Sequence, residues 1–263
     1  MAENPYAPPK TRVEDAPTSL PDGDFLPEGR GVPAGNGWKW ITDAWAFMAG
    51  QRWTFVGVFV LLMVINILSQ FIPLVGPLAL TLFSPVLIGG FVLGCDAVRN
   101  GEPFEVGHLF AGFRRHTGKL VALGAISLAF TLVAGVIMVA IVGVSFLPLM
   151  TGTGAEPSPD EVLGMMVPLL LGVLVVVALS LPLTMAMLFA TPLIVLRDVD
   201  IGTALKTSFL VCLKNLLSFL VWGVAALVLG ILAVIPLLLG LLIVGPLMMV
   251  SIYVSYRDIF HET

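Results

Sequence analysis

Charged residues are scarce in this sequence. They make up 11% of its 263 residues, whereas hydrophobic residues make up 58% and the mean hydropathy is +1.02. A soluble domain carries about 25% charged residues, because its surface must stay hydrated. Residues 53–95 and 215–256 contain no charge at all, and each stretch is long enough for two spans of roughly 20 residues. The scarcity of charge excludes a soluble globular protein and predicts an all-α, polytopic membrane protein.

Cysteine is nearly missing as well, and no cleavable signal peptide is visible. Cys95 and Cys212 are too few for a disulfide framework. The first 30 residues are acidic and rich in proline, unlike the basic segment and apolar run of a signal peptide. We therefore expect the first span to act as an uncleaved signal anchor. Residues 1–36 have few large apolar side chains and are predicted to form a disordered tail, followed by a membrane domain over residues 37–263.

Motifs for catalysis are also absent. The sequence has no His-Glu-x-x-His metal motif and no Gly-x-x-x-x-Gly-Lys phosphate loop. No charged residue lies inside an apolar stretch except near its basic end, which disfavours a proton relay or an intramembrane protease. His108, His116 and the neighbouring Cys95–Asp96 pair could gather a metal ion, but their spacing matches no known site. We expect no enzyme activity, no cofactor and no metal.

Six apolar stretches predict six transmembrane helices. The fourth has 35 residues, and a straight helix of that length would measure roughly 52 Å, well beyond a bilayer core of ~30 Å. This stretch must tilt, project from the membrane, or kink at Pro182 or Pro192. The predicted spans cover residues 53–71, 78–97, 120–147, 162–196, 215–234 and 236–256.

The positive charge lies on one side of this layout. All 13 Lys and Arg residues precede the first span, follow the last, or lie between spans two and three or four and five. The positive-inside rule then places both termini in the cytoplasm. Basic residues of the two inner connections should form a rim that contacts anionic lipid first and a protein partner second, and no nucleic acid. This inner rim comprises Arg99, Arg114, Arg115, Lys119, Lys206 and Lys214.

A threefold pattern runs through the chain. Each pair of spans follows a short amphipathic segment, at 37–52, 105–119 and 200–214, and leaves the membrane at an arginine: Arg99, Arg197 or Arg257. We expect three interfacial helices with their apolar faces in the headgroup layer, in a threefold repeat or by convergence of juxtamembrane connectors. Their predicted apolar faces are Trp38, Ile41, Trp45 and Met48, then Val106, Leu109, Phe110 and Phe113, then Ile201, Leu205, Phe209 and Cys212.

Polar residues and prolines in the spans leave two interpretations open. Asn66, Ser69 and Gln70 could line a solute path, or mark a helix end among the headgroups. One proline in the second helix of each pair, at Pro85, Pro182 and Pro246, could surround a polar cavity or merely set helix curvature. Convergence of these residues on a wet cavity would favour transport, and a solid apolar bundle would favour a scaffold. Small-residue pairs should pack spans within the chain, with dimer formation as the alternative: Gly90 with Gly94, Ala125 with Ala129, and Ala186 with Ala190.

Two stretches carry a family resemblance, "GNGWKWITDAWAFM" at 35–48 and "LFSPVLIGGFVLGCDAVRNGEPFEVGHLFAGFRRHTGKL" at 82–120. They resemble an uncharacterised family of proteobacterial multi-pass inner-membrane proteins. The layout is also loosely similar to the membrane domain of glycerophosphodiester phosphodiesterases, whose catalytic domain has no counterpart here. The resemblance implies a bacterial inner-membrane location and this architecture, but no catalytic residues.

The first residues offer a candidate handle for a cytoplasmic protein. Prolines favour an extended polyproline conformation, which would present a tyrosine at low entropic cost. A solvated tail without a partner is the alternative. The motif comprises Asn4, Pro5, Tyr6, Pro8 and Pro9. From the sequence we expect a non-enzymatic structural or interaction protein, with a passive transporter or permeation pathway for a small or lipidic solute as the alternative.

Overall fold

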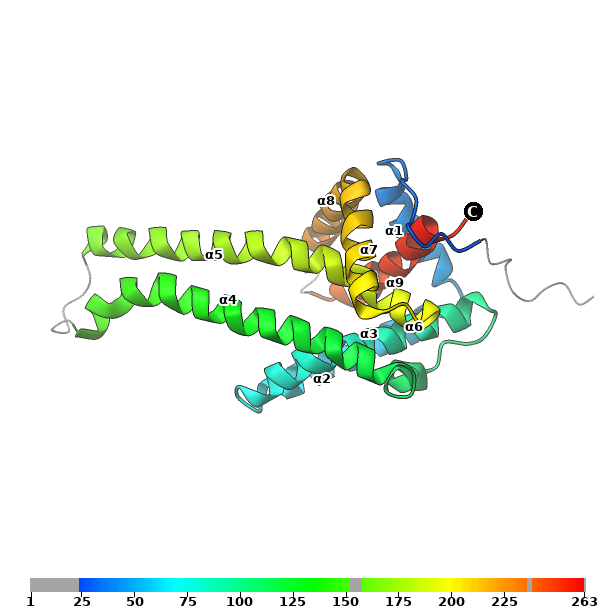
Figure 1. Ribbon diagram of the computed structural model, residues 1–263, viewed down its shortest axis with the longest axis horizontal. Coiled ribbons are helices and arrows are strands. Elements are labelled where there is room, and N and C mark those ends of the chain that lie inside the picture. The colour runs from blue at the N-terminus through cyan, green and yellow to red at the C-terminus, as the bar shows by residue number, and fades with distance from the viewer. Residues whose placement is uncertain (1–23, 152–157, 236–237, 263) are drawn as a thin grey trace, which may run out of the picture.

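A computed structural model describes residues 24–151, 158–235 and 238–262. In these ranges the chain is helical apart from connections and one isolated bridge between Phe25 and His261. Figure 1 shows α4 and α5 as a long hairpin, with the C-terminus at the opposite end of the molecule. The helices are α1 (Asn36–Phe47), α2 (Arg52–Gln70), α3 (Val75–Arg99), the 3₁₀ helix η1 (Val106–Phe113), α4 (Thr117–Thr151), α5 (Pro159–Leu188), α6 (Ala190–Arg197), α7 (Ile201–Lys214), α8 (Leu216–Val234) and α9 (Leu241–Phe260).

Six helical stretches in the described residues are long and apolar enough to cross a membrane. They confirm the predicted all-α polytopic class and the predicted number of spans. Their bounds are Arg52–Gln70, Val75–Arg99, Thr117–Gly143, Met166–Arg197, Leu216–Val234 and Leu241–Phe260.

The long fourth stretch kinks between α5 and α6. Its helical ladder breaks at Phe189, whose N–H donates to Ser208 Oγ (2.9 Å), while that hydroxyl donates to the Met185 carbonyl (2.6 Å). A side chain of α7 thus replaces one i→i−4 hydrogen bond of the span. Pro192, in the first turn of α6, has no N–H to offer the Leu188 carbonyl. The kink predicted at Pro182 or Pro192 therefore belongs to Pro192, and α5 continues through Pro182.

The three connector helices pack in a cyclic order. The first, α1, lies against α8 and α9; η1 lies against α3; and α7 lies against α5 and α6. Each connector therefore contacts the preceding pair of spans, and α1 closes the circle on the last pair. In Figure 1, α7 runs across the direction of α4 and α5, as an interfacial helix should. This packing follows the threefold pattern of the sequence. We call the end formed by α1, η1, α7 and the last residues of α3, α6 and α9 the basic end.

The core lies toward the basic end. One buried cluster gathers around Phe189, Leu193 and Tyr256, and a second around Phe55 and Phe91. Toward the other end of the spans, apolar side chains of α4, α5 and α8 are mostly exposed on the protein surface. Because lipid solvates such side chains, burial between helices is needed only where polar connectors must be held in place.

The apolar stripes predicted for α1 and η1 are only partly buried between helices. Around α1, Ile41 and Met48 are buried, whereas Trp38 and Trp45 are 53% and 41% exposed on the protein surface, which is compatible with the predicted position in the headgroup layer. Trp40, outside the predicted stripe, is buried because α1 packs against α8 and α9.

In η1 only one residue of the predicted stripe, Leu109, is buried; Val106, Phe110 and Phe113 are exposed. A 3₁₀ helix has three residues per turn, so Leu109 and Gly112 share the face that meets α3. For α7, Cys212 is buried and the other predicted residues, Ile201, Leu205 and Phe209, are half-buried.

Glycines allow η1 and α3 to approach closely. A Cβ on Gly112 would collide with the Val86 carbonyl oxygen, and one on Gly90 with the Leu109 carbonyl oxygen. Gly94 faces the Phe104 ring in the same way. The Gly90–Gly94 pair therefore packs a connector against a span, rather than two spans together. Elsewhere, Ala125 and Ala129 are exposed and Ala186 and Ala190 are half-buried and buried.

Residues 24–35, which belong to the predicted tail, make specific contacts in the structure. Arg30 donates to Asp258 Oδ1 (2.8 Å), and Asn36 Nδ2 and Trp40 Nε1 both donate to Asp258 Oδ2 (2.7 Å each). On the other side, Asn215 accepts from the Val32 N–H and donates to the Arg30 carbonyl. Residues 24–35 are therefore bound between the end of α9 and the junction of α7 with α8, whereas residues 1–23 of the predicted tail lie outside the described residues.

Candidate functional site

Four arginines from different segments line two neighbouring cavities at the basic end. Arg99 is the last residue of α3, Arg197 the last of α6, and Arg257 lies near the end of α9. Arg115 follows η1. Arg257 lines both cavities, so they share part of one wall. We call these four residues the arginine cluster. Three of them are the arginines at which the three pairs of spans end, so the cyclic packing brings equivalent positions together.

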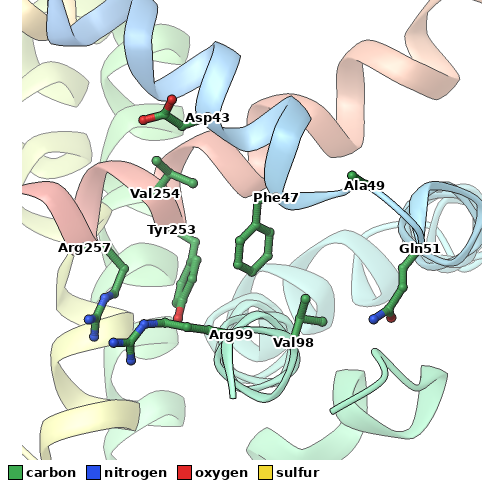
Figure 2. A pocket seen from close by; sticks show the side chains of 9 residues that line it. All are labelled: Asp43, Phe47, Ala49, Gln51, Val98, Arg99, Tyr253, Val254 and Arg257. Carbon is green, nitrogen blue, oxygen red and sulfur yellow. The ribbon is translucent and has the colours of Figure 1, made fainter. Parts of the chain in front are cut away.

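The larger cavity has a volume of 470 Å³ and a mixed lining. Figure 2 shows Arg99 and Arg257 beside the ring of Tyr253, with Phe47 facing that ring and Asp43 above. The Tyr253 hydroxyl donates to Asp96 Oδ1 (3.2 Å), which fixes the tyrosine between the ends of α3 and α9. The remaining lining residues are Ala49, Gln51, Val98 and Val254. One wall is therefore apolar and the other carries guanidinium groups.

The smaller cavity has a volume of 100 Å³ and is mostly polar. Arg115, Arg197 and Arg257 line it together with Asp96, Leu196 and His261. Across both cavities four arginines stand against two aspartates, Asp43 and Asp96. Because an arginine side chain stays protonated in proteins, the site carries excess positive charge even when both carboxylates are ionised.

Contacts from both chain ends hold Arg197 in place. Its Nη2 lies 2.6 Å from His261 Nε2, and its guanidinium lies 4.7 Å from the centre of the Phe25 ring. Arginine can only donate, so His261 Nε2 accepts and the imidazole carries its proton on Nδ1. The bridge between Phe25 and His261 therefore fixes the guanidinium that points into the smaller cavity.

Five of the six residues of the predicted inner rim line one of four different pockets. Arg99 and Arg115 belong to the arginine cluster, whereas Arg114 lines a separate pocket beside His108. Lys206 and Lys214 line a third pocket, where Lys214 also donates to the Gly29 carbonyl (3.0 Å). Two residues of the rim therefore line the cavities of the arginine cluster, and three line other pockets.

Lys119 pairs with a carboxylate of its own protein. Its Nζ donates to Asp198 Oδ1 (2.8 Å), and this hydrogen bond lowers the pKa of the exposed Asp198 below its ordinary value. His116 Nδ1 lies 3.0 Å from the same oxygen. Lys119 thus ties the start of α4 to the end of α6.

The residues considered for a metal ion are engaged separately. His108 Nδ1 accepts the Glu105 N–H at the start of η1 (3.0 Å), His116 faces Asp198, and Cys95 is buried in α3. In residues 24–151, 158–235 and 238–262, no three His, Cys, Asp or Glu side chains are grouped closely enough to hold a metal.

The residues considered for a solute path line none of the cavities described above. Asn66, Gln70 and Pro182 are exposed, whereas Pro85 and Pro246 are buried. Hydroxyl groups of the spans donate to carbonyls of their own helices. These hydroxyl groups therefore have hydrogen-bond partners without a polar cavity. These bonds run from Thr81 to Pro77, Ser84 to Thr81, Thr131 to Ser127, Ser180 to Val177 and Thr184 to Ser180.

Sequence reasoning named only half of the arginine cluster. Arg197 and Arg257 were noted as span ends but not as site residues, although the repeat itself was the signal that equivalent residues could converge. The candidate handle in the tail, Asn4, Pro5, Tyr6, Pro8 and Pro9, lies outside the described residues.

No protein-family model, curated protein or solved structure matches this chain. The resemblance to proteobacterial inner-membrane proteins therefore stays a prediction, and a functional proposal has to be built from the site itself.

Proposed function

We propose that this integral membrane protein is a non-enzymatic interaction or scaffold protein of the bacterial inner membrane. Its working surface would be the basic end, facing the cytoplasm with both termini. One observation supports this proposal: the connector helices, the buried core and the cavities described above all lie at the basic end.

The arrangement of the spans favours this role over passive permeation. The polar residues and prolines that would have to surround a solute path are divided between exposed and buried positions. A membrane protein that holds its connector helices in a closed cycle presents a stable surface, which suits docking. The tail motif around Tyr6 would add a second, flexible contact on the same side.

The orientation is tested by fusions at the C-terminus. A green fluorescent protein fused after residue 263 should fluoresce, and alkaline phosphatase at the same position should be inactive, because each reporter works on one side of the membrane only. The opposite pair of results would contradict the proposed orientation.

The interaction role is tested by site-specific photocrosslinking in living cells. A benzoylphenylalanine at Lys206, which is exposed at the basic end, or at Tyr6 should give ultraviolet-dependent adducts of discrete protein mass. The matched control is Val136, 70% exposed on α4, which should contact lipid and give no such adduct. Identical adduct patterns at Lys206 and Val136 would refute a docking surface at the basic end.

The permeation alternative is tested by osmotic swelling of proteoliposomes that contain the purified chain. We expect swelling rates equal to those of empty liposomes for small uncharged solutes. A protein-dependent increase would favour the passive pathway and count against the scaffold role.

A further inference from the structure

The arginine cluster has the composition of an anion site. Arg99, Arg115, Arg197 and Arg257 come from four segments that are distant in sequence, yet line two cavities that share Arg257. A folded chain keeps like charges together only where other interactions hold them, because guanidinium groups repel one another at close range. Here the hydrogen bond from Arg197 to His261 and the Phe25 ring supply part of that support.

The arginine side chains indicate which class of anion the cavities would bind. A planar guanidinium presents five N–H donors in a fork that matches the oxygens of a carboxylate or phosphate. Several such forks from different directions suit a tetrahedral phosphate better than a planar carboxylate, because its oxygens point toward several sides. The smaller cavity, at 100 Å³, is lined by three of the four arginines and would hold the charged group.

The larger cavity suggests what is attached to that phosphate. Its volume of 470 Å³ falls within the range of about 300–1,000 Å³ that small-molecule sites occupy. Phe47, Val98 and Val254 give it an apolar wall, while Gln51 and Asp43 can hydrogen-bond hydroxyl groups. A phosphate that carries a polyol on one side and an apolar chain on the other would satisfy both walls.

We propose that the two cavities form one binding site for a phosphate-bearing anion. Its sources are the headgroup of an anionic phospholipid, such as phosphatidylglycerol, or a soluble phosphate compound. Arg115, Arg197 and Arg257 bind the phosphate, and Arg99 and Tyr253 border the part attached to it. The inference names a ligand class for the basic end, and it does not require the protein partner proposed above.

The test is thermal unfolding of the purified full-length chain in neutral detergent, followed by tryptophan fluorescence. Ligand that binds only the folded state raises the midpoint in a concentration-dependent manner. Phosphatidylglycerol is titrated against phosphatidylcholine, and sodium phosphate against sodium chloride at equal ionic strength. A rise with phosphatidylglycerol alone assigns the lipid source. A rise with inorganic phosphate that also competes with the lipid assigns the soluble source.

Arg114 and Arg115 are adjacent in the sequence, and only Arg115 lines the proposed site, so their variants form a matched pair. Arg115→Gln removes a cavity arginine, whereas Arg114→Gln removes the same charge from the adjacent exposed position outside the two cavities. We expect Arg115→Gln to weaken apparent affinity at least tenfold and Arg114→Gln to leave it unchanged. Arg257→Lys, which keeps the charge but loses the fork, should also weaken binding tenfold or more. Arg115 is exposed, so its variant still decides the question if Arg257→Lys does not fold.

Two results would overturn the proposal. One is a wild-type midpoint that responds equally to phosphatidylglycerol and phosphatidylcholine, and equally to phosphate and chloride. The other is an equal loss of affinity in Arg114→Gln and Arg115→Gln, because that outcome means general attraction to a basic surface. The titration contains no other protein, so its result is independent of whether photocrosslinking finds a partner.

Discussion

Asp258 joins the first described residues to the last helix. Its carboxylate accepts hydrogen bonds from Arg30, Asn36 and Trp40 and is only partly exposed. A hydrogen bond to a charged group contributes about 1.5–3 kcal/mol to the free energy of unfolding. Removal of the charge leaves desolvated donors without an equivalent acceptor.

Asp258→Asn should therefore lower the free energy of unfolding by about 1.5–3 kcal/mol, since the new amide N–H₂ also faces donors. Thermal or dodecyl-sulfate unfolding in detergent measures the change. Asp24→Asn is the control, because Asp24 is an exposed carboxylate of the same segment. Equal stability of the two variants would contradict the role of Asp258.

Cys212 should be chemically inert in the folded protein. Burial raises its pKa to about 12, so at pH 8 only about one thiol in 10⁴ is the reactive thiolate. Cys95 is fully buried in α3. We expect N-ethylmaleimide to label neither cysteine until dodecyl sulfate is added, as measured by mass spectrometry. Lys206→Cys, an exposed position on the same helix, should be labelled within minutes, and rapid labelling of the wild-type chain would disagree with the packing of α7.

At the scale of elements, contact between η1 and α3 depends on glycine. Gly112 allows η1 to lie on the backbone of α3 at Val86, whereas Gly107 in the same helix faces open space. These two positions form a natural pair for substitution, because both lie in η1 and only one meets another helix.

Gly112→Ala should reduce the free energy of unfolding by about 1–3 kcal/mol, because the added methyl group forces the two backbones apart. Gly107→Ala should change it by less than about 0.5 kcal/mol. Both are measured by the same unfolding assay. A tolerated Gly112→Ala would mean that η1 does not lie against α3 as described.

Besides Pro192, one hydroxyl group of α7 takes part in the kink between α5 and α6. Ser208→Ala leaves the Phe189 N–H and the Met185 carbonyl without that bridge in a buried place, which should cost about 1–3 kcal/mol. Ser180→Ala is the control, because the Ser180 hydroxyl donates only to a carbonyl of its own helix. If both alanine variants unfold at the same midpoint, the Ser208 hydroxyl does not stabilise the kink.

For the whole molecule, α1 closes the cyclic arrangement, and the residues that precede α1 add to that contact. Residues 24–35 contact the end of α9 and the start of α8, so they anchor the start of α1 to the last pair of spans. The effect of an N-terminal truncation on stability should therefore depend on whether it removes these hydrogen bonds, rather than on its position in the sequence.

Removal of residues 1–23 should leave the unfolding midpoint unchanged. Removal of residues 1–35 should lower it by more than Asp258→Asn does, because the contacts to Asn215, Lys214 and Ser218 are lost as well. The two truncated chains are compared in the same detergent. A stable chain without residues 1–35 would show that this segment does not hold the cycle closed.

The sequence by itself determined the class, the number of spans and their grouping in pairs. Length and apolarity decide whether a helix crosses a bilayer, and both are local properties. For the fourth stretch the sequence left tilting, projection from the membrane, or a kink at Pro182 or Pro192 open, and the structure places the break beside Pro192.

Only the tertiary structure decided which faces are buried and where the arginines meet. A hydropathy pattern cannot distinguish a side chain that faces lipid from one that faces another helix, since both environments are apolar. Trp38 is therefore exposed on the protein surface while Trp40 is buried, a difference that the pattern does not show. Arg99, Arg197 and Arg257 lie far apart in sequence, and the cyclic packing of connector helices brings them to shared cavities. That convergence depends on contacts between residues distant along the chain.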